Sequence, residues 1–331
     1  MSDRTGPLRI GILGAARIAP LAVIRPAREV PGVQVTAIAA RDRGRAEAFA
    51  KKHEIGRVHS SYDELVDDSD VDAVYIPLPN GLHAEWTLRA IAAGKHVLCE
   101  KPFTSNEAEA IQVADASDAS DRVVMEAFHY RYHALAERMH TIAHDGTLGD
   151  ITSVRTWLCF PLPKFSDIRY NYSLGGGASM DCCYPIHALR LLAPGRPEVV
   201  SATAKLHGDK IDRAMTAHYR FPSGATGRTD ASMWSWRALR IAAHVEGTRG
   251  RMRVLNYVAP QYYNKLALTV DGKTTRERVR GDTSYVAQLR AFVAAVRDGT
   301  PFPTTPRDAV ETMRIIDDVY RAAGLPLRGE H

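Results

Sequence analysis

A short turn near the start of the chain has the residue types that bind a diphosphate. The apolar run 8–13 leads into Gly14, Ala16 and Ala19, which fall on the three glycine positions of the dinucleotide fingerprint. Gly14 permits the tight turn, Ala16 is the smallest substitute where backbone approaches the pyrophosphate, and Ala19 packs helix on strand. Backbone N–H groups of the following helix would hold the diphosphate; the alternative is a similar turn without a ligand. The predicted cofactor contacts here are Gly14, Ala15, Ala16, Arg17 and Ile18.

The end of the next apolar run favours NADP over NAD. An NAD site usually has a carboxylate there to accept hydrogen bonds from the ribose hydroxyls, but this chain has Ala40 followed by Arg41. A guanidinium can pair with a 2′-phosphate through two hydrogen bonds. The alternative is a surface arginine, and under either interpretation Asp42 can cap the next helix. We therefore expect Ala40 and Arg41 to contact the cofactor.

The elements that would position these residues alternate along the first 130 residues. Nearly continuous apolar runs are typical of parallel strands covered on both faces. The runs lie at 8–13, 35–40, 71–76, 96–99 and 123–126, and candidate helices at 43–53, 83–93, 106–117 and 132–145. This βαβ alternation predicts an α/β domain over residues 1–130 with a doubly wound parallel sheet.

The pattern changes to longer alternating segments after residue 150. These segments lie at 152–158, 199–206, 215–221, 225–233, 239–246 and 251–258, with helices at 185–192, 284–297 and 306–322. Alternation of apolar and polar residues favours an antiparallel sheet with one solvated or ligand-facing side. We predict an α+β domain over residues 131–331 with a large, mainly antiparallel open sheet, which would bind substrate and another subunit.

Composition restricts the class of protein further. The net charge of +5 comes from scattered residues, which argues against a nucleic-acid surface. The four cysteines, Cys99, Cys159, Cys182 and Cys183, lack metal-ligand spacing and indicate a reducing compartment. The first apolar stretch is interrupted by Gly14 and Arg17, so it resembles neither a signal peptide nor a membrane span. We expect a cytoplasmic protein with no membrane or nucleic-acid partner.

Six motifs carry a family resemblance that spans nearly the whole chain. They are GKHVLCEKP at 94–102, YIPLPNGLH at 75–83, EAFHYRYH at 126–133, DIRY at 167–170, LGGGASMD at 174–181 and TTPRDA at 304–309. Together they resemble the Gfo/Idh/MocA oxidoreductases, and most of all the branch of NADP-dependent D-xylose and trans-dihydrodiol dehydrogenases. The resemblance implies a Rossmann domain, NADP(H) as the preferred cofactor with NAD(H) possible, and hydride transfer at a CH–OH carbon of a sugar, polyol or diol.

The resemblance places Lys101 at the nicotinamide, hydrogen-bonded to the reacting oxygen. An ammonium there would stabilise the alkoxide that develops as hydride leaves. The alternative is a surface lysine, but Lys101 lies between Glu100 and Pro102 at the carboxyl end of a predicted parallel strand, where α/β sheets bind ligands. The further expected cofactor contacts are Leu78, Asn80, His83, Glu100, Lys101 and Arg131.

The acid–base residue is harder to assign, because this chain departs from the family. The family has a His or Tyr four residues after its Asp, whereas Tyr184 follows Asp181 by three residues, with one residue and a glycine lost. Since proline suits the first turn of a helix, a helix should start at Pro185, with Asp181 in the preceding turn. Tyr184 is the first candidate to move the proton, His187 is the rival, and Asp181 would bind substrate hydroxyls or orient the acid–base residue.

Several further residues have two interpretations. Arg131 and Arg169 could bind polar groups of the cofactor or substrate, or each could form an interdomain ion pair. Arg169, with Lys101, Asp181 and Tyr184, is an expected substrate contact. His129 and His133 have i,i+4 spacing, but no third ligand is evident and we expect no metal. Three tyrosines could face the ligand or partner side of the sheet, or pack in a core or interface, and packing is the favoured interpretation. They are Tyr257, Tyr262 and Tyr263.

Two other functions remain open at this point. The same fold serves NAD(P)-binding regulatory proteins without catalysis, and the family includes NAD-dependent glycoside-cleaving enzymes that recycle the cofactor. The partner we expect is a small carbohydrate-like or diol substrate. An open sheet face commonly pairs with another subunit, so a homodimer or homotetramer through the second domain's sheet is expected.

Overall fold

The computed structural model describes residues 6–234 and 239–329, which form two compact units. The first unit contains the described residues up to Thr104, with Ala108–His129 and Tyr285–Val310. The second contains Ser105–Glu107, Tyr130–Ser284 and the described residues from Glu311 onward. The units are therefore discontinuous in sequence. The division into domains 1–130 and 131–331 stays a prediction.

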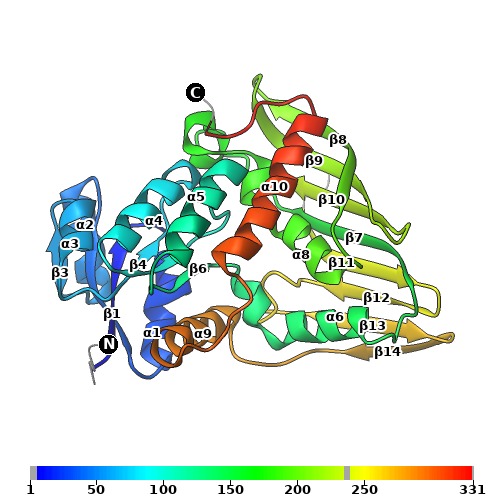
Figure 1. The fold of residues 1–331 in the computed structure, drawn as a ribbon, viewed down its shortest axis with the longest axis horizontal. Coiled ribbons are helices and arrows are strands. Elements are labelled where there is room, and N and C mark those ends of the chain that lie inside the picture. The colour runs from blue at the N-terminus through cyan, green and yellow to red at the C-terminus, as the bar shows by residue number, and fades with distance from the viewer. Residues whose placement is uncertain (1–5, 235–238, 330–331) are drawn as a thin grey trace. The chain divides into compact units, whose positions relative to one another are not determined.

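The first unit is built on a six-stranded sheet (Figure 1). Its strands are β1 (Leu8–Leu13), β2 (Val33–Ala39), β3 (Arg57–His59), β4 (Ala73–Ile76), β5 (His96–Cys99) and β6 (Val124–Glu126). All pairs are parallel, and the order is β3-β2-β1-β4-β5-β6. This is the order of the Rossmann fold, so the prediction of a doubly wound parallel sheet is confirmed.

The helices of the first unit follow from local signals. They are the π-helix η1 (Pro20–Ile24), the 3₁₀ turn η2 (Asn80–Leu82), α1 (Arg25–Glu29), α2 (Arg43–His53), α3 (Tyr62–Asp67), α4 (His83–Ala92), α5 (Glu107–Asp118) and α9 (Ser284–Asp298). Asp42 accepts a hydrogen bond from the Arg45 N–H at 2.9 Å and Ser61 accepts one from the Glu64 N–H at 3.1 Å. These contacts cap α2 and α3, and the predicted cap at Asp42 is confirmed.

The second unit is built on an eight-stranded sheet (Figure 1). Its strands are β7 (Ile151–Cys159), β8 (Glu198–His207), β9 (Ile211–Arg220), β10 (Thr226–Ser232), β11 (Arg240–Gly247), β12 (Gly250–Leu255), β13 (Lys265–Val270) and β14 (Lys273–Glu277). The order is β14-β13-β12-β11-β7-β10-β9-β8, antiparallel except for the β7–β10 pair. The expected large, mainly antiparallel sheet is confirmed.

One helix covers the middle of this sheet. The helical elements of the unit are η3 (His129–Tyr132), α6 (Ala134–His144), η4 (Ile168–Tyr170), η5 (Tyr172–Leu174), α7 (Ala178–Asp181), α8 (Tyr184–Leu192) and α10 (Pro306–Ala322). Helix α8 is buried over most of its length and packs on β7, β10 and β11. The Thr156 hydroxyl of β7 donates a hydrogen bond to the Pro185 carbonyl at 2.7 Å, which ties the first turn of α8 to the sheet.

Several elements were not predicted, and four of them, β3, α3, β13 and β14, have few buried side chains. Strand β3 and helix α3 are three and six residues long, with few buried side chains. Strand β14 is exposed at every residue, and β13 is fully buried only at Leu266. The three strands among them are held by backbone hydrogen bonds to neighbouring strands, which do not require an apolar face.

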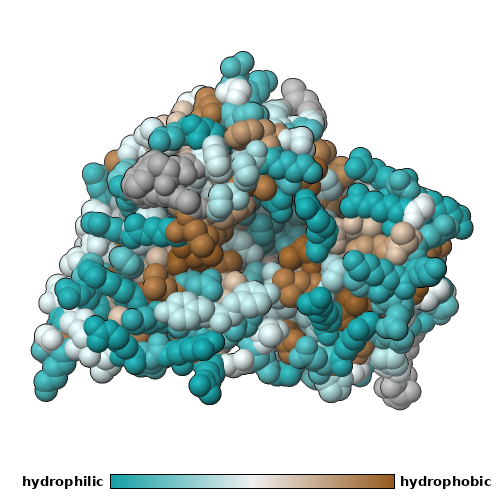
Figure 2. All heavy atoms as spheres, turned by 180° about the vertical axis from the view of Figure 1, so that it is seen from behind, coloured by the Kyte–Doolittle hydropathy of each residue, from teal (hydrophilic) through white to brown (hydrophobic). Residues whose placement is uncertain are grey.

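The surface carries scattered hydrophobic side chains. In the face that Figure 2 shows, hydrophobic atoms gather in a few patches among hydrophilic ones. Among residues 6–234 and 239–329, no helix is long and apolar enough to cross a membrane.

Candidate functional site

The diphosphate turn lies where β1 ends. Gly14 has φ +103°, a conformation that side-chain-bearing residues rarely adopt, and its N–H donates to the Ala39 carbonyl at 2.7 Å. A Cβ at Gly14 would lie 3.2 Å from the Leu78 side chain, which follows β4. Strands β1 and β4 are neighbours at the point where the sheet order reverses. Dinucleotides bind at the carboxyl ends of strands at such a point, so Gly14 and Leu78 lie together at a suitable edge, and their contact with a cofactor stays a prediction.

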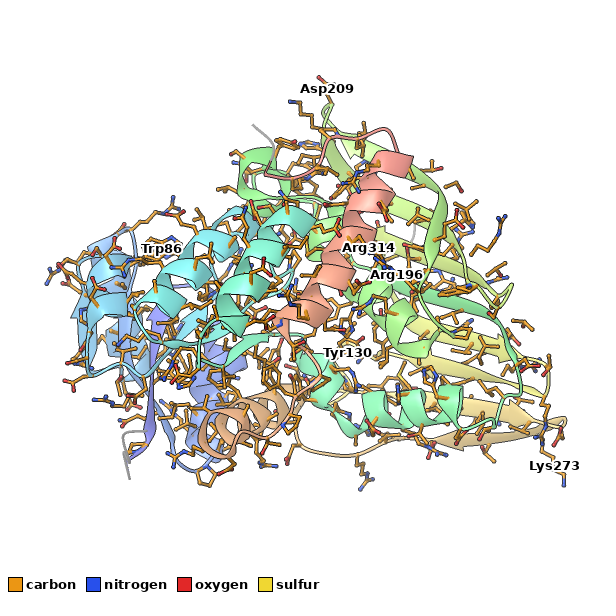
Figure 3. All side chains as sticks on the ribbon, viewed as in Figure 1. Trp86, Tyr130, Arg196, Asp209, Lys273 and Arg314 are labelled. Atoms are coloured by element: carbon orange, nitrogen blue, oxygen red, sulfur yellow. The ribbon has the colours of Figure 1, made fainter. Side chains whose placement is uncertain are left out.

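Cationic and aromatic residues surround this turn. The Arg45 guanidinium donates to the Ala15 carbonyl at 2.8 Å, and the Tyr62 hydroxyl lies 3.8 Å from where a Gly14 Cβ would be. Burial raises the pKa of Tyr62, and the positive charge of Arg41 opposes that rise. Tyr62 also packs edge-on against Trp86, labelled in Figure 3. The sequence reasoning missed Tyr62 and Arg45, since α3 was not predicted and Arg45 lies inside a helix.

Lys101 follows β5, is half-buried and lies beside buried titratable groups. The Tyr75 hydroxyl donates to the Glu100 carboxylate at 2.7 Å. Burial raises the pKa of Glu100, while the Lys101 charge and the Tyr75 hydrogen bond oppose the rise. Burial, helped by the Lys101 charge, lowers the pKa of His129 to about 3. The ammonium of Lys101 therefore lies beside one acidic group and near an imidazole that stays neutral at physiological pH.

His83 is fully buried, and its ring joins two backbone segments. Its Nδ1 lies 2.8 Å from the Pro102 carbonyl and its Nε2 lies 2.9 Å from the Leu78 carbonyl. Burial lowers its pKa to about 4, with the Lys101 charge acting in the same direction and the two carbonyls opposing it. A direct cofactor contact from His83 stays a prediction, while the structure shows it fixing the segments that carry Leu78 and Lys101.

In the second unit, Asp181 pairs with Arg169. The Arg169 Nε lies 3.2 Å from an Asp181 carboxylate oxygen, and its Nη1 donates to Asp167 at 2.9 Å. These ion pairs of Arg169 lie within the second unit, whereas the predicted alternative was an interdomain ion pair. Asp181 is the last residue of α7, so the expectation that it lies in a turn is wrong. The reason is that a short helix forms at residues 178–181, where Asp212 accepts the Ser179 N–H at 2.8 Å.

Tyr184 and His187 share the first turns of α8. The helix begins at Tyr184, one residue before the predicted start, with Pro185 in its first turn. The Tyr130 hydroxyl lies 2.6 Å from Nδ1 of His187, and the Tyr130 ring is 5.8 Å from the ring of Tyr184. Both candidate acid–base residues are therefore buried against Tyr130, a residue that sequence reasoning did not single out; Figure 3 labels it.

A shallow hollow lies beside Asp167, one of the two ion-pair partners of Arg169. It has a volume of about 520 Å³ and lies between the segment that precedes α7 and the β8–β9 hairpin. Its lining includes Phe165, Asp167, Tyr170, His207 and Lys210. The rings of Phe165 and His207 stack 4.8 Å apart, so this part of the unit offers aromatic surface next to charged groups.

The remaining predicted residues have mostly structural contacts. Arg131 lies 3.8 Å from Glu137, and its role at the cofactor stays a prediction. His129 stacks on Tyr285 at 4.0 Å, whereas His133 caps α6 by accepting the Leu135 N–H at 3.0 Å. Within the described parts of the chain, no cluster of three or more His, Cys, Asp or Glu could hold a metal.

The tyrosine group divides between core and surface. Tyr257 is buried with its ring 5.5 Å from that of Tyr130, and the pKa of Tyr257 is raised by burial. Tyr262 and Tyr263 are exposed. Core packing therefore describes Tyr257 alone.

Comparison with known proteins gives two family matches that together cover most of the chain. Residues 8–128 match the model described as "Oxidoreductase family, NAD-binding Rossmann fold" of the Gfo/Idh/MocA proteins. Residues 136–253 match the "GFO/IDH/MocA C-terminal domain". Each match falls on one of the two sheets described above.

Individual relatives match over similar lengths. The chain is 36% identical to a D-xylose 1-dehydrogenase (NADP(+)) of Haloferax volcanii, covering 96% of this chain and 97% of that one. It is 32% identical to the trans-1,2-dihydrobenzene-1,2-diol dehydrogenase of Mus musculus, over 76% of each. Among solved structures, a 3-ketoreductase of Actinomadura kijaniata in complex with NADP and TDP-benzene has a TM-score of 0.89 at 29% identity, covering 96% of this chain and 98% of that one.

Proposed function

Since the chain belongs to the Gfo/Idh/MocA oxidoreductase family, we propose that it is an NADP(H)-dependent dehydrogenase or reductase acting on the CH–OH group of a sugar, polyol or dihydrodiol. The observation that carries the proposal is the position of Lys101, directly after β5 at the ligand-binding edge of a Rossmann sheet that also carries the Gly14 turn. The names of the xylose and dihydrodiol dehydrogenases support the substrate class.

The residues around Gly14 fit an NADP cofactor. Backbone N–H groups of the turn (Gly14, Ala15, Ala16, Arg17 and Ile18) would hold the diphosphate, and the small side chains of Ala15 and Ala16 allow a close approach to the backbone. The positive φ of Gly14 and the neighbouring Leu78 side chain leave no room for a Cβ without displacement. Arg41 is exposed at the end of β2, where the alternative NAD chemistry would need a carboxylate. Arg41 would therefore pair with the 2′-phosphate.

The cofactor supplies the hydride acceptor or donor, and Lys101 supplies the charge that the reaction needs. When an alcohol is oxidised, the carbinol C–H bond breaks with its electron pair leaving as hydride, and the O–H bond loses a proton. The Lys101 ammonium would donate a hydrogen bond to the oxygen as negative charge develops on it. In the reverse direction the same ammonium would polarise the carbonyl. Glu100, buried and bonded to Tyr75, would keep the backbone and charge around Lys101 fixed.

Tyr184 would carry the proton, with His187 as its rival. Tyr184 begins α8 and is buried there, and its phenol is the group that would exchange a proton with the substrate oxygen. His187 lies three residues later on the same helix face, and Nδ1 of its ring is already engaged by Tyr130. Asp181 and Arg169 would bind the substrate's other hydroxyls, because their ion pair presents both acceptors and donors.

Two properties of the whole molecule complete the proposal. We propose a homodimer or homotetramer that forms through the eight-stranded sheet, because its strands β8 and β14 expose most of their side chains. We also propose a cytoplasmic location. All four cysteines are buried thiols in the structure, as expected of a protein kept in a reducing compartment.

The function is tested by binding and turnover of the purified protein. NADPH fluorescence titration should show saturable binding, and a panel of aldoses, polyols and trans-dihydrodiols with NADP⁺ should give at least one substrate with net accumulation of NADPH. Binding without turnover of any compound would favour a regulatory protein. Turnover without net NADPH would favour a glycoside-cleaving enzyme that recycles its cofactor.

A further inference from the structure

A fully buried ion pair lies directly behind the segment that carries Asp181 and Tyr184. Arg328 and Asp212 both have 0% exposed side chains, and Nη2 of Arg328 lies 2.9 Å from Oδ1 of Asp212. Charges are rarely buried without full hydrogen bonding, so the groups that this pair binds indicate its role.

Arg328 contacts backbone on two sides of the pair. Its Nε donates to the Gly176 carbonyl at 2.7 Å, Nη1 donates to the Pro326 carbonyl at 2.9 Å and Nη2 donates to the Lys210 carbonyl at 3.2 Å. The guanidinium also lies over the Tyr320 ring, 4.1 Å from its centre. The planar guanidinium of Arg328 thus uses Nε, Nη1 and Nη2 as hydrogen-bond donors, a geometry that a lysine could not reproduce.

Asp212 holds the same segment from the other side. Its Oδ2 accepts both the N–H and the hydroxyl of Ser179 at 2.8 Å, and its Oδ1 accepts the Tyr320 hydroxyl at 3.0 Å. Asp212 lies at the start of β9, just after the hairpin turn where Figure 3 labels Asp209. The carboxylate therefore joins the sheet, helix α10 and the first turn of α7.

The two glycines between these contacts have no space for a side chain. Gly177 has φ +141°, and a Cβ there would collide with the Asp212 carboxylate and lie 2.7 Å from the Tyr320 hydroxyl. A Cβ at Gly176 would lie 2.5 Å from the carbonyl oxygen of Arg169, the partner of Asp181. Close packing on both sides fixes the backbone that leads into Asp181 and Tyr184.

We propose that Arg328 and Asp212 are positioning residues for the reaction, acting through residues 176–179 to set the placement of Asp181 and Tyr184. The proposal rests on the proposed function for its effect on turnover. It goes beyond that function because Arg328 lies 144 positions beyond Tyr184 in the sequence and belongs to none of the motifs of the family resemblance. A displacement of about 1 Å at a reacting group can reduce the rate about 100-fold.

The test uses the full chain with Arg328→Lys, which keeps the charge and loses the fork. We expect kcat to fall about 10- to 100-fold while the Kd for NADPH stays within about twofold. Hydrogen exchange measured by mass spectrometry should accelerate in peptides covering residues 176–187 and not in peptides covering β10. The matched control is Arg321→Lys on α10, where an exposed arginine pairs with Asp318, and it should leave both measurements unchanged.

A milder variant keeps the test decisive if Arg328→Lys does not fold. Tyr320→Phe removes one hydrogen bond to Asp212 and should lower kcat about threefold or more with the same local change in exchange. Either variant, folded and with wild-type kcat, would overturn the positioning role, whether or not exchange changes. A wild-type protein that turns over no substrate would instead reject the proposed function, and the exchange measurement would still decide whether Arg328 holds residues 176–187.

Discussion

The two regions that carry the predicted catalytic residues are held in different ways. Lys101 stands at the end of a short buried strand in a parallel sheet, and its neighbours Glu100 and Pro102 are held by Tyr75 and His83 of the same unit. Tyr184 stands after a glycine-rich segment that is held by Asp212 and Arg328, far away in the sequence. The first arrangement depends on regular secondary structure, and the second on one buried cluster of polar side chains.

Because the two regions are held differently, they should respond differently to mutation. Substitution of Lys101 should remove a chemical group from a site that stays in shape, because the sheet fixes its backbone. Substitution around the glycine-rich segment should change the shape itself. Measurements of kcat, cofactor affinity and stability can separate the two cases.

The largest effect is expected at Lys101. Lys101→Met removes the ammonium and retains most of the side chain's volume, so kcat should fall about 10³-fold because the developing alkoxide loses its stabilising donor. NADPH affinity measured by fluorescence should change less than about threefold. Lys51→Met, an exposed lysine on α2, is the control and should keep wild-type kcat. An unchanged kcat in Lys101→Met would refute the role of Lys101.

A smaller loss is expected at Tyr184. Tyr184→Phe removes only the hydroxyl, and kcat should fall about 100-fold because proton transfer loses its positioned group. The pH profile of kcat should lose the limb that reports on the acid–base residue. His187→Asn should have a smaller effect on kcat. If His187→Asn abolishes turnover and Tyr184→Phe does not, the two roles are reversed.

Cofactor preference should depend on Arg41. Arg41→Ala should weaken NADPH binding about tenfold and leave NADH binding nearly unchanged, because only the 2′-phosphate loses a charge-assisted hydrogen bond. Parallel titrations with the two nucleotides measure the ratio. Arg28→Ala, an exposed arginine paired with Glu54, should leave that ratio unaltered. Equal losses of affinity for NADPH and NADH would show that Arg41 does not bind the 2′-phosphate.

The smallest effect concerns a buried carboxyl of the second unit. Burial raises the pKa of Asp317 to about 7, opposed by a hydrogen bond from the Glu107 N–H. The folded state then keeps this proton to a higher pH than the unfolded chain, so stability should decrease as pH rises from about 4 through 7. Asp317→Asn stays neutral and should gain about 1–2 kcal/mol at pH 8, seen as a Tm higher by a few degrees. At pH 4 the two melting curves should coincide; a gain at both pH values would exclude the titration of Asp317 as the cause.

Much of the first unit could be predicted because its signals are local. Apolar runs gave five of the strands, and Gly14, Leu78 and Lys101 lie at strand ends. The predicted turn at Gly14 has the positive φ that glycine permits. What escaped prediction was α3 with Tyr62, since a short helix with few buried residues leaves no periodic pattern.

The second unit was predictable in its sheet and less so in its site. The alternation of residues gave the antiparallel strands, but the helical state of Asp181 depends on Asp212, which comes from another strand. Tyr130 and Arg328 escaped for the same reason, because a buried hydrogen bond between distant residues has no signature in local sequence. Short-range pattern thus predicts regular elements, while long-range polar contacts appear only in the fold.

The most direct test of the account follows the hydrogen atom itself. A substrate identified in the turnover panel is prepared with deuterium on its reacting carbinol carbon and incubated with wild-type protein and NADP⁺. The account predicts that mass spectrometry will find the deuterium in the NADPH that accumulates. Deuterium released to water, or an unlabelled cofactor after complete turnover, would contradict direct hydride transfer.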